Sequence, residues 1–239
     1  MCNPINKRGG IVIARRYSSE ESKKRILSAC VKLFIENGYH STTLSEILSE
    51  ADVTSSTFQN IFKTKDGVLL DLTEFMFESQ FAAAKKITEM NLSPVYTYAI
   101  ETSIQMTLAE LNENLRDVYV EAYTNAETSE YIFVQTSKEL FNIFGNYVPN
   151  GTESSFYEME IGTAGIMRNY MAKKCDMYFT LEKKLERFLS MTLGIYNVPE
   201  KEKAEVIAFV MKIDVRKIAN QIMQELFRAL AMRFEFELG

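Results

Sequence analysis

The stretch TLSEILSEADVTSSTFQNIF, from Thr43 to Phe62, decides the fold of the first part of this chain. Thr43 and Glu46 have the spacing of a capping box, which starts a helix by satisfying two backbone N–H groups at once. Ala51-Asp52-Val53 predicts a short turn, because Asp tolerates the left-handed backbone conformation better than most residues. Thr54 can then cap a second helix. The stretch therefore predicts two short helices joined by a tight turn.

The second of these helices has two unlike faces. Phe58, Ile61 and Phe62 recur at helical spacing and can pack inward. The other side carries small, amide and basic side chains, which suit a helix that must approach base edges in a DNA groove. A solvated outer face has the same composition, so that alternative stays open. The candidate DNA-binding residues of this stretch and the residue after it are Thr43, Thr54, Ser55, Ser56, Thr57, Gln59, Asn60 and Lys63.

Helices are also expected on both sides of this stretch. Ser18 or Ser19 can cap a helix with an apolar stripe of Ile26, Cys30, Leu33 and Phe34, and Gly38 can end it in a left-handed conformation. Leu44, Ile47 and Leu48 are expected to form the apolar face of the next helix. Thr64 can cap a fourth helix that runs to about residue 86, and Lys65 near its start is a candidate phosphate contact.

Charge is distributed unevenly along the 239 residues. Residues 1–65 carry ten basic and six acidic side chains, a balance of +4, whereas the whole chain carries −5. A basic end on an acidic body indicates a polyanion-binding region, although chance variation also produces such a pattern. Residues 1–19 are expected to form a flexible basic arm from which Arg15 and Arg16 can reach DNA, and a tail that never touches DNA is the alternative that stays open.

Several residues of this region match a known pattern. They are Arg25 to Phe34, Asn37-Gly38-Tyr39, Thr42-Thr43, Ile47, Ala51 to Thr54, Thr57-Phe58, Phe62 to Lys65, and Leu69. Over roughly residues 20–80 the chain closely resembles the DNA-binding domain of the TetR (tetracycline-repressor) family. Asp52 stands where the family usually has Gly, Ser56 where Gly or Ala is frequent, Gln59 where an aromatic residue is common, and Ile61 where Tyr or His is common. Gln59 can still hydrogen-bond DNA, but Ile61 cannot.

The resemblance implies a larger helical domain for effector binding and dimerisation over residues 81–239. The expected fold is all-α, with a three-helix helix-turn-helix domain at residues 20–80, its motif at 43–62. Every segment beyond residue 90 has helical periodicity: about 93–112, 115–126, 129–147, 153–174, 181–196, and a last stretch that breaks near Asp214. Candidate ligand-binding residues are Phe75, Tyr119, Tyr123, Met167 and Tyr170, and dimerisation is expected through segments near 155–174 and 215–235.

Composition argues against other classes. Three cysteines are too few for a disulfide framework, and no apolar run approaches the ~18 residues of a membrane span, so a cytoplasmic protein is expected. The single histidine, His40, lies in a polar connector, and we expect no catalytic residues, metal or cofactor.

Three functions remain open at this point. The favoured one is a homodimeric repressor that binds a palindromic double-stranded DNA operator and is released by a small-molecule effector. In this hypothesis the fourth helix acts as a lever between pocket and DNA, and a rigid connector between two domains is its alternative role. The second is an activator, or a regulator controlled by a protein partner. The third is an all-helical enzyme or carrier.

Overall fold

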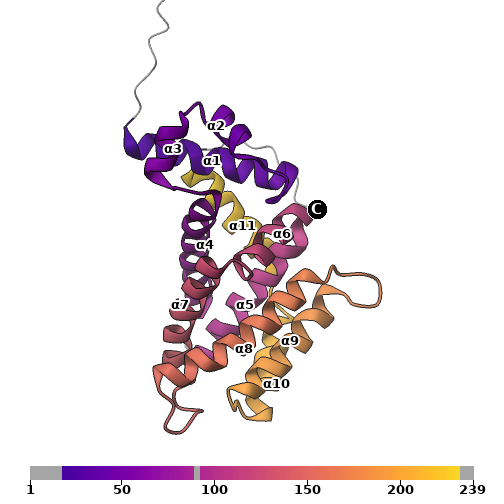
Figure 1. Ribbon diagram of the computed structural model, residues 1–239. Coiled ribbons are helices and arrows are strands. Elements are labelled where there is room, and N and C mark those ends of the chain that lie inside the picture. The colour runs from indigo at the N-terminus through magenta and orange to yellow at the C-terminus, as the bar shows by residue number, and fades with distance from the viewer. Residues whose placement is uncertain (1–17, 89–91, 232–239) are drawn as a thin grey trace, which may run out of the picture.

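The computed structural model describes residues 18–88 and 92–231, and within these ranges the chain forms eleven helices and no strands (Figure 1). The predicted all-α architecture is confirmed for this part of the chain. The helices are α1 (Ser19–Asn37), α2 (Leu44–Ala51), α3 (Ser55–Ile61), α4 (Lys65–Thr88), α5 (Pro94–Leu111), α6 (Glu113–Ala122), α7 (Ala126–Phe144), α8 (Glu153–Ala172), α9 (Leu181–Ile195), α10 (Glu200–Val210) and α11 (Val215–Ala229).

The first three helices, α1 to α3, form a small unit at one end of the molecule, which we call the recognition unit, and the helices after α4 form the body (Figure 1). The starts of α1 to α3 follow the local signals in the sequence: Ser18 caps α1, Thr54 caps α3, and Thr43 and Glu46 form the expected capping box on α2. Asp52 has φ 50° and ψ 53°, which is the left-handed turn conformation predicted for it. Because each signal acts within a few residues, packing elsewhere does not override it.

Two details of this unit differ from the sequence prediction. Leu44 is 38% exposed and does not belong to the apolar face of α2, which consists of Ile47 and Ala51 with a half-buried Leu48. The reason is that α1 holds the other end of α2, where Arg25 Nε donates to the Ala51 carbonyl over 2.7 Å. Gly38 has a positive φ of 86°, but its ψ of 157° sends the chain away extended and not in a left-handed turn.

The corner between α3 and α4 requires a glycine. Thr64 accepts a hydrogen bond from the backbone N–H of Gly67 over 3.2 Å, which caps α4 as expected. A Cβ atom on Gly67 would lie 2.3 Å from the carbonyl oxygen of Phe62, a distance that no side chain tolerates. The close approach brings the start of α4 directly under the recognition unit.

Helix α5 forms the centre of the larger part of the chain. It is buried along nearly its whole length and contacts α4, α6, α7, α8, α9, α10 and α11. Several of its buried residues are polar, and the hydroxyls of Thr102, Ser103 and Thr107 donate to backbone carbonyls four residues earlier, so they are satisfied within the helix. The bounds of α5 to α9 agree with the expected segments to within four residues, and Asp214 caps α11 at the expected break.

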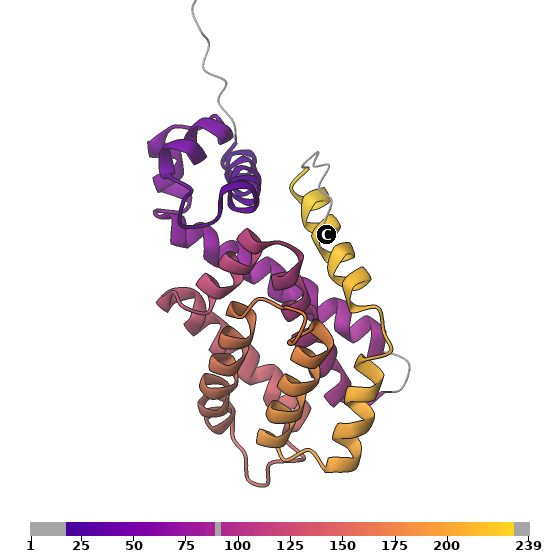
Figure 2. The same ribbon diagram turned by 90° about the vertical axis from the view of Figure 1, so that its right-hand side faces the viewer.

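Helix α11 runs back from the body toward the first three helices (Figure 2). Its apolar stripe packs inside the chain, mainly on α5 and α4: Ile222, Met223, Leu226 and Phe227 are buried. Just past its end, Leu230 and Ala231 border a surface hollow whose other wall is formed by α1 and the end of α2.

Helix α6 anchors α1 to the body. Asn114 Nδ2 donates to the backbone carbonyls of Ile35 and Glu36 over 2.9 Å and 3.1 Å. These carbonyls lie in the last turn of α1, where helical partners are missing. His40 Nε2 lies 3.2 Å from Glu121 Oε2 on the same helix. The recognition unit is therefore attached to the body through α6 as well as through α4.

A buried ion cluster joins α5, α6 and α9 below this contact. Glu110 lies 2.5 Å from the Lys184 ammonium and 3.0 Å from the Arg116 guanidinium. All three side chains are buried. Because a buried charge without a partner is costly, Glu110 compensates the two cations and fixes the three helices relative to each other.

Candidate nucleic-acid interface and ligand cavity

Helix α3 presents the polar face that the sequence predicted. Ser55, Ser56, Gln59 and Asn60 are exposed on its outer side. Phe58 is buried on its inner side and packs against Phe62, with ring centroids 6.0 Å apart. The inner contacts hold the short helix in place, so its outer face is available to a partner.

The cap residues combine exposure with a structural role. Thr54 accepts from the backbone N–H of Thr57 over 3.1 Å, and the two hydroxyl oxygens lie 2.9 Å apart. Thr43 and Glu46 are both exposed, and the backbone and hydroxyl of Thr43 lower the pKa of the Glu46 carboxyl by donating to it. These hydroxyls stand beside the start of each helix, where backbone N–H groups point outward.

The two lysines after α3 differ in environment. Lys63 is exposed and sits at φ 61° in the turn that leads to α4. Lys65 is half-buried: its ammonium donates to the carbonyls of Tyr39 and Thr42 over 2.8 Å and 3.0 Å and lies 4.2 Å from the Tyr39 ring centroid. Lys65 therefore joins the α1–α2 connection to α4, which sequence reasoning did not foresee.

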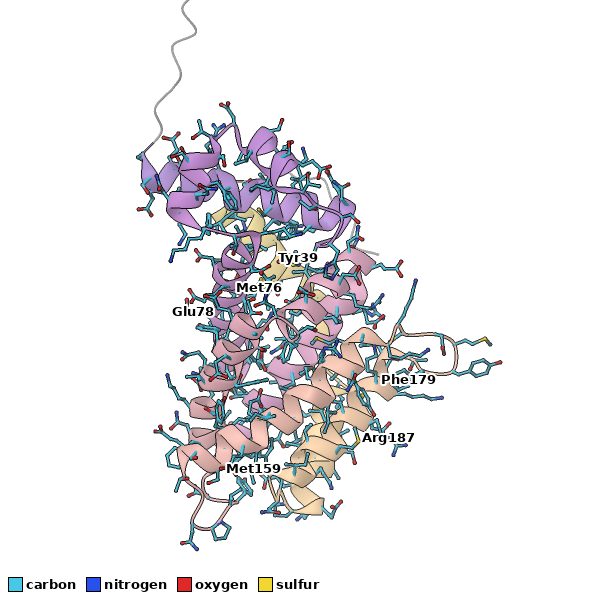
Figure 3. All side chains as sticks on the ribbon, viewed as in Figure 1. Tyr39, Met76, Glu78, Met159, Phe179 and Arg187 are labelled. Carbon is cyan, nitrogen blue, oxygen red and sulfur yellow. The ribbon has the colours of Figure 1, made fainter. Side chains whose placement is uncertain are left out.

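Tyr39 occupies the junction between the recognition unit and the body (Figure 3). Its hydroxyl donates to Asp66 over 2.5 Å, and burial raises its pKa well above the ordinary value.

Most of the predicted DNA contacts are exposed in the structure: Thr43, Thr54, Ser55, Ser56, Gln59, Asn60 and Lys63. Thr57 and Lys65 are half-buried, and Arg15 and Arg16 lie outside the described residues. Ile61 is half-buried and packs against the core.

Comparison with known proteins addresses the identity of this unit. Residues 26–72 match the family described as bacterial regulatory proteins, tetR family, and this segment contains α2, α3 and most of α1. Residues 26–72 therefore match the DNA-binding segment of the TetR family. The resemblance stated from the sequence is thereby confirmed, and so is the helix-turn-helix fold class.

Individual proteins that are similar to this chain are distant from it in sequence. The uncharacterized HTH-type transcriptional regulator YerO of Bacillus subtilis (strain 168) is 25% identical over 160 residues, which are 63% of this chain and 55% of YerO. The HTH-type transcriptional regulator HbdR of Aromatoleum sp. (strain CIB) is 42% identical over 50 residues, 21% of this chain and 22% of HbdR. The matches thus span about half or less of each relative.

Two solved structures are similar at low identity. A gamma-butyrolactone receptor (ArpA-like protein) gives a TM-score of 0.45 at 17% identity and covers 87% of this chain and 100% of that structure. Salmonella enterica GusR gives a TM-score of 0.48 at 18% identity and covers 74% of this chain and 96% of that structure.

The structure contains a cavity of about 80 Å³ between α1 and helices of the larger part of the chain. Its walls come from α1, α4, α5, α6, α7 and α11 and are mostly apolar. Met76 of α4, labelled in Figure 3 below Tyr39, borders it. Three residues of α1, namely Val31, Phe34 and Ile35, form part of the wall.

The polar side chains of the cavity wall are Thr73, whose hydroxyl donates to the Leu69 carbonyl, and two tyrosines and two glutamines. Gln80 Nε2 donates to the Tyr119 hydroxyl oxygen over 2.7 Å, and the Tyr123 hydroxyl donates to Gln105 Oε1 over 2.7 Å. Tyr119 and Tyr123 are the pair that the sequence singled out, and both line the cavity. The glutamines were missed, although an amide inside an apolar helical run, as in Ile104-Gln105-Met106, was the available signal.

The other predicted ligand residues lie elsewhere. Phe75 is half-buried on α4 but does not line the cavity. Met167 is buried on α8, and Tyr170 packs edge-on against Phe179 and Phe188. The structure therefore brings two of the five predicted residues together at the cavity.

Two buried acids extend this polar group into the core. Glu101 of α5 accepts from Gln105, and Glu160 of α8 accepts from the Thr163 hydroxyl over 2.8 Å. Burial raises the pKa of Glu101 to about 7 and that of Glu160 to about 8. Neither acid was predicted from the sequence. Within residues 18–88 and 92–231, no cluster of three or more histidine, cysteine or acidic side chains could hold a metal ion.

None of the described helices combines the length and apolar character needed to cross a membrane.

Proposed function

We propose that this chain is a transcriptional repressor that binds a palindromic DNA operator as a homodimer and responds to a small molecule. The observation that carries the proposal is the exposed face of α3, where Ser55, Ser56, Gln59 and Asn60 stand on a helix locked from behind by Phe58. Amide side chains can donate and accept at one base edge, and small hydroxyls let the backbone approach the groove. Lys63 supplies a phosphate contact beside this face.

The second copy would pack on α8 and α9. Their shared outer side exposes apolar surface: Ile161 is 48% exposed, Met191 36% and Ile195 38%. Beside Ile161, a Cβ on Gly162 or Gly165 would meet nothing within 4 Å, so a partner helix can approach closely. The apolar side chains of α11, in contrast, are already used inside the chain. A helix-turn-helix protein reads two half-sites as a two-fold dimer, so a second copy is the occupant that this face requires.

The cavity supports control by a small molecule. Its walls include α1, which is part of the recognition unit, and α4, which runs from that unit into the body. At 1.5 Å per residue, α4 is ~36 Å long. A ligand that fits better when these helices are displaced would lower operator affinity, and operator DNA would lower ligand affinity by the same factor. The division into a DNA-binding domain at 20–80 and an effector and dimerisation domain at 81–239 is part of this proposal, with α4 shared between them.

Selection of random duplex DNA by the full chain tests the proposal. We expect enrichment of a palindrome whose half-sites are about one helical turn, ~34–36 Å, apart. Asn60→Ala should abolish or change the selected sequence, whereas Ser154→Ala, exposed at the start of α8, should select the same sequence as the unaltered chain. Recovery of no preferred sequence, or of the same sequence by Asn60→Ala, would contradict the assignment of α3 as the reading helix.

A further inference from the structure

The cavity between α1 and the body has no charged wall. Its described lining residues are apolar except for Thr73, Gln80, Gln105, Tyr119 and Tyr123. A charged ligand group placed here would lose its hydration without gaining an ion-pair partner in the wall, which is strongly unfavourable. Glu101 does not line the cavity, but it accepts a hydrogen bond from Gln105, which does. Because its pKa is raised to about 7, Glu101 is partly protonated near neutral pH. The cavity therefore favours an uncharged molecule.

Its two tyrosines are not equivalent. The Tyr123 hydroxyl proton is donated to Gln105, so it is already used. The Tyr119 hydroxyl accepts from Gln80, and that bond uses an oxygen lone pair and leaves the proton. Burial raises the pKa of Tyr119 far above neutral pH, so the hydroxyl remains protonated. Tyr119 is thus a hydrogen-bond donor that the wall can offer to a ligand, and the second amide proton of the neighbouring Gln80 is the alternative donor.

We propose that the cavity binds an uncharged, largely apolar molecule with a carbonyl-type acceptor, and that the Tyr119 hydroxyl donates to this acceptor. The proposal rests on the proposed ligand response and names the chemical class of the ligand. Gln80 orients the Tyr119 oxygen, and Val31, Phe34 and Ile35 of α1 contact the apolar part of the ligand.

Ligand size follows from the volume and the residues that can move. The cavity measures about 80 Å³, whereas an engineered protein cavity of roughly 150 Å³ holds benzene. A six-membered ring therefore requires the walls to yield. Met76 and Met223 border the cavity, and methionine side chains are unbranched and adjust to irregular shapes. Larger ligands must displace these side chains or α1 itself.

A matched set of six-membered-ring probes tests the class. The set is cyclohexanone, cyclohexane, cyclohexylammonium and cyclohexanecarboxylate, each titrated into the full chain at millimolar concentrations with melting temperature and heat of binding as readouts. Cyclohexanone should bind most tightly and raise the melting temperature most, because a ligand that binds only the folded state stabilises it. Tighter binding of either charged probe would overturn the proposal.

Variants test the donor. Tyr119→Phe keeps the ring and removes the proton, so cyclohexanone affinity should fall about 2- to 10-fold while cyclohexane affinity is unchanged. Gln80→Met removes the partner but keeps the Tyr119 hydroxyl, so the preference for cyclohexanone over cyclohexane should survive. Loss of that preference in Gln80→Met but not in Tyr119→Phe would show that the glutamine is the donor and would refute the assignment.

DNA binding is measured separately with the operator selected above. A chain that binds operator but prefers no neutral probe refutes this inference and leaves the DNA-binding function standing. A chain that takes up cyclohexanone with the stated preference but selects no DNA sequence refutes the function and leaves the ligand class standing.

Discussion

Replacement of Glu160 by Gln should change how stability depends on pH. Glu160 is 4% exposed and its carboxylate accepts a hydrogen bond from Thr163. Burial raises the pKa of Glu160, and the nearby negative charge of Glu101 raises it further. Thr163 in turn lies 2.8 Å from the Tyr196 hydroxyl, so the acid belongs to a polar group shared by α8 and α9. Gln keeps the shape of the side chain but carries no titrating proton.

The sign and size follow from the raised pKa. Burial moves the pKa of Glu160 from 4.5 to about 8, so between these values the folded chain holds a proton that the unfolded chain has lost. Stability must therefore fall as pH rises through this window. Within this window, each pH unit lowers the free energy of unfolding by ~1.4 kcal/mol. Between pH 5.5 and 7.5, Glu160 alone therefore lowers it by about 3 kcal/mol. Glu101, with a pKa of about 7, acts in the same direction.

Urea denaturation at pH 5.5 and 7.5, at one protein concentration, measures the effect. The unaltered chain should lose stability across this interval, and Glu160→Gln should lose about 3 kcal/mol less. Glu158→Gln is the control, because Glu158 is exposed on the same helix and should leave the pH dependence as it is. Equal pH slopes in the unaltered chain and Glu160→Gln would refute the reasoning, since burial would then not have raised the pKa of this acid.

Three further outcomes are expected. Asn60→Ala should weaken operator binding by ~1–3 kcal/mol, measured by fluorescence anisotropy, and leave the melting temperature unchanged; a lower melting temperature would mean that Asn60 supports the fold. Met191→Glu should convert the dimer to monomer in sedimentation, because it places a charge in the proposed apolar interface, and a dimer that persists would assign the interface to other helices. Glu110→Gln should lower the free energy of unfolding in urea by ~3–5 kcal/mol, because it leaves Lys184 and Arg116 buried without a counter-charge, and a loss below ~1 kcal/mol would mean that solvent reaches the cluster.

Local sequence signals predicted the recognition unit well. The capping box of Thr43 and Glu46 and the left-handed Asp52 depend on neighbours within three residues, so a sequence contains all the information they need. Leu44 was misplaced because helical spacing predicts a face but not the point at which the neighbouring helix stops covering it. Lys65 bonds to carbonyls 23 and 26 residues away, which no local pattern indicates.

The cavity was predictable only in part. Tyr119 and Tyr123 stood out by type and spacing, but the partner that sets the role of Tyr119 is Gln80, 39 residues earlier. The participation of α1 in the wall arises from the docking of α6 on the end of α1 through Asn114. Such contacts depend on how helices pack in three dimensions, and the hydrophobic periodicity of a sequence does not predict them.

The presence of Val31, Phe34 and Ile35 in the cavity wall limits how freely this protein can be recombined. A hybrid that joins residues 20–80 of this chain to the body of another family member would carry part of one binding cavity into another. Under the proposed function, ligand preference and DNA recognition therefore cannot be exchanged as separate modules in this chain. Sequence changes that adapt the cavity to a new ligand must also preserve the helix on which the DNA-reading unit is built.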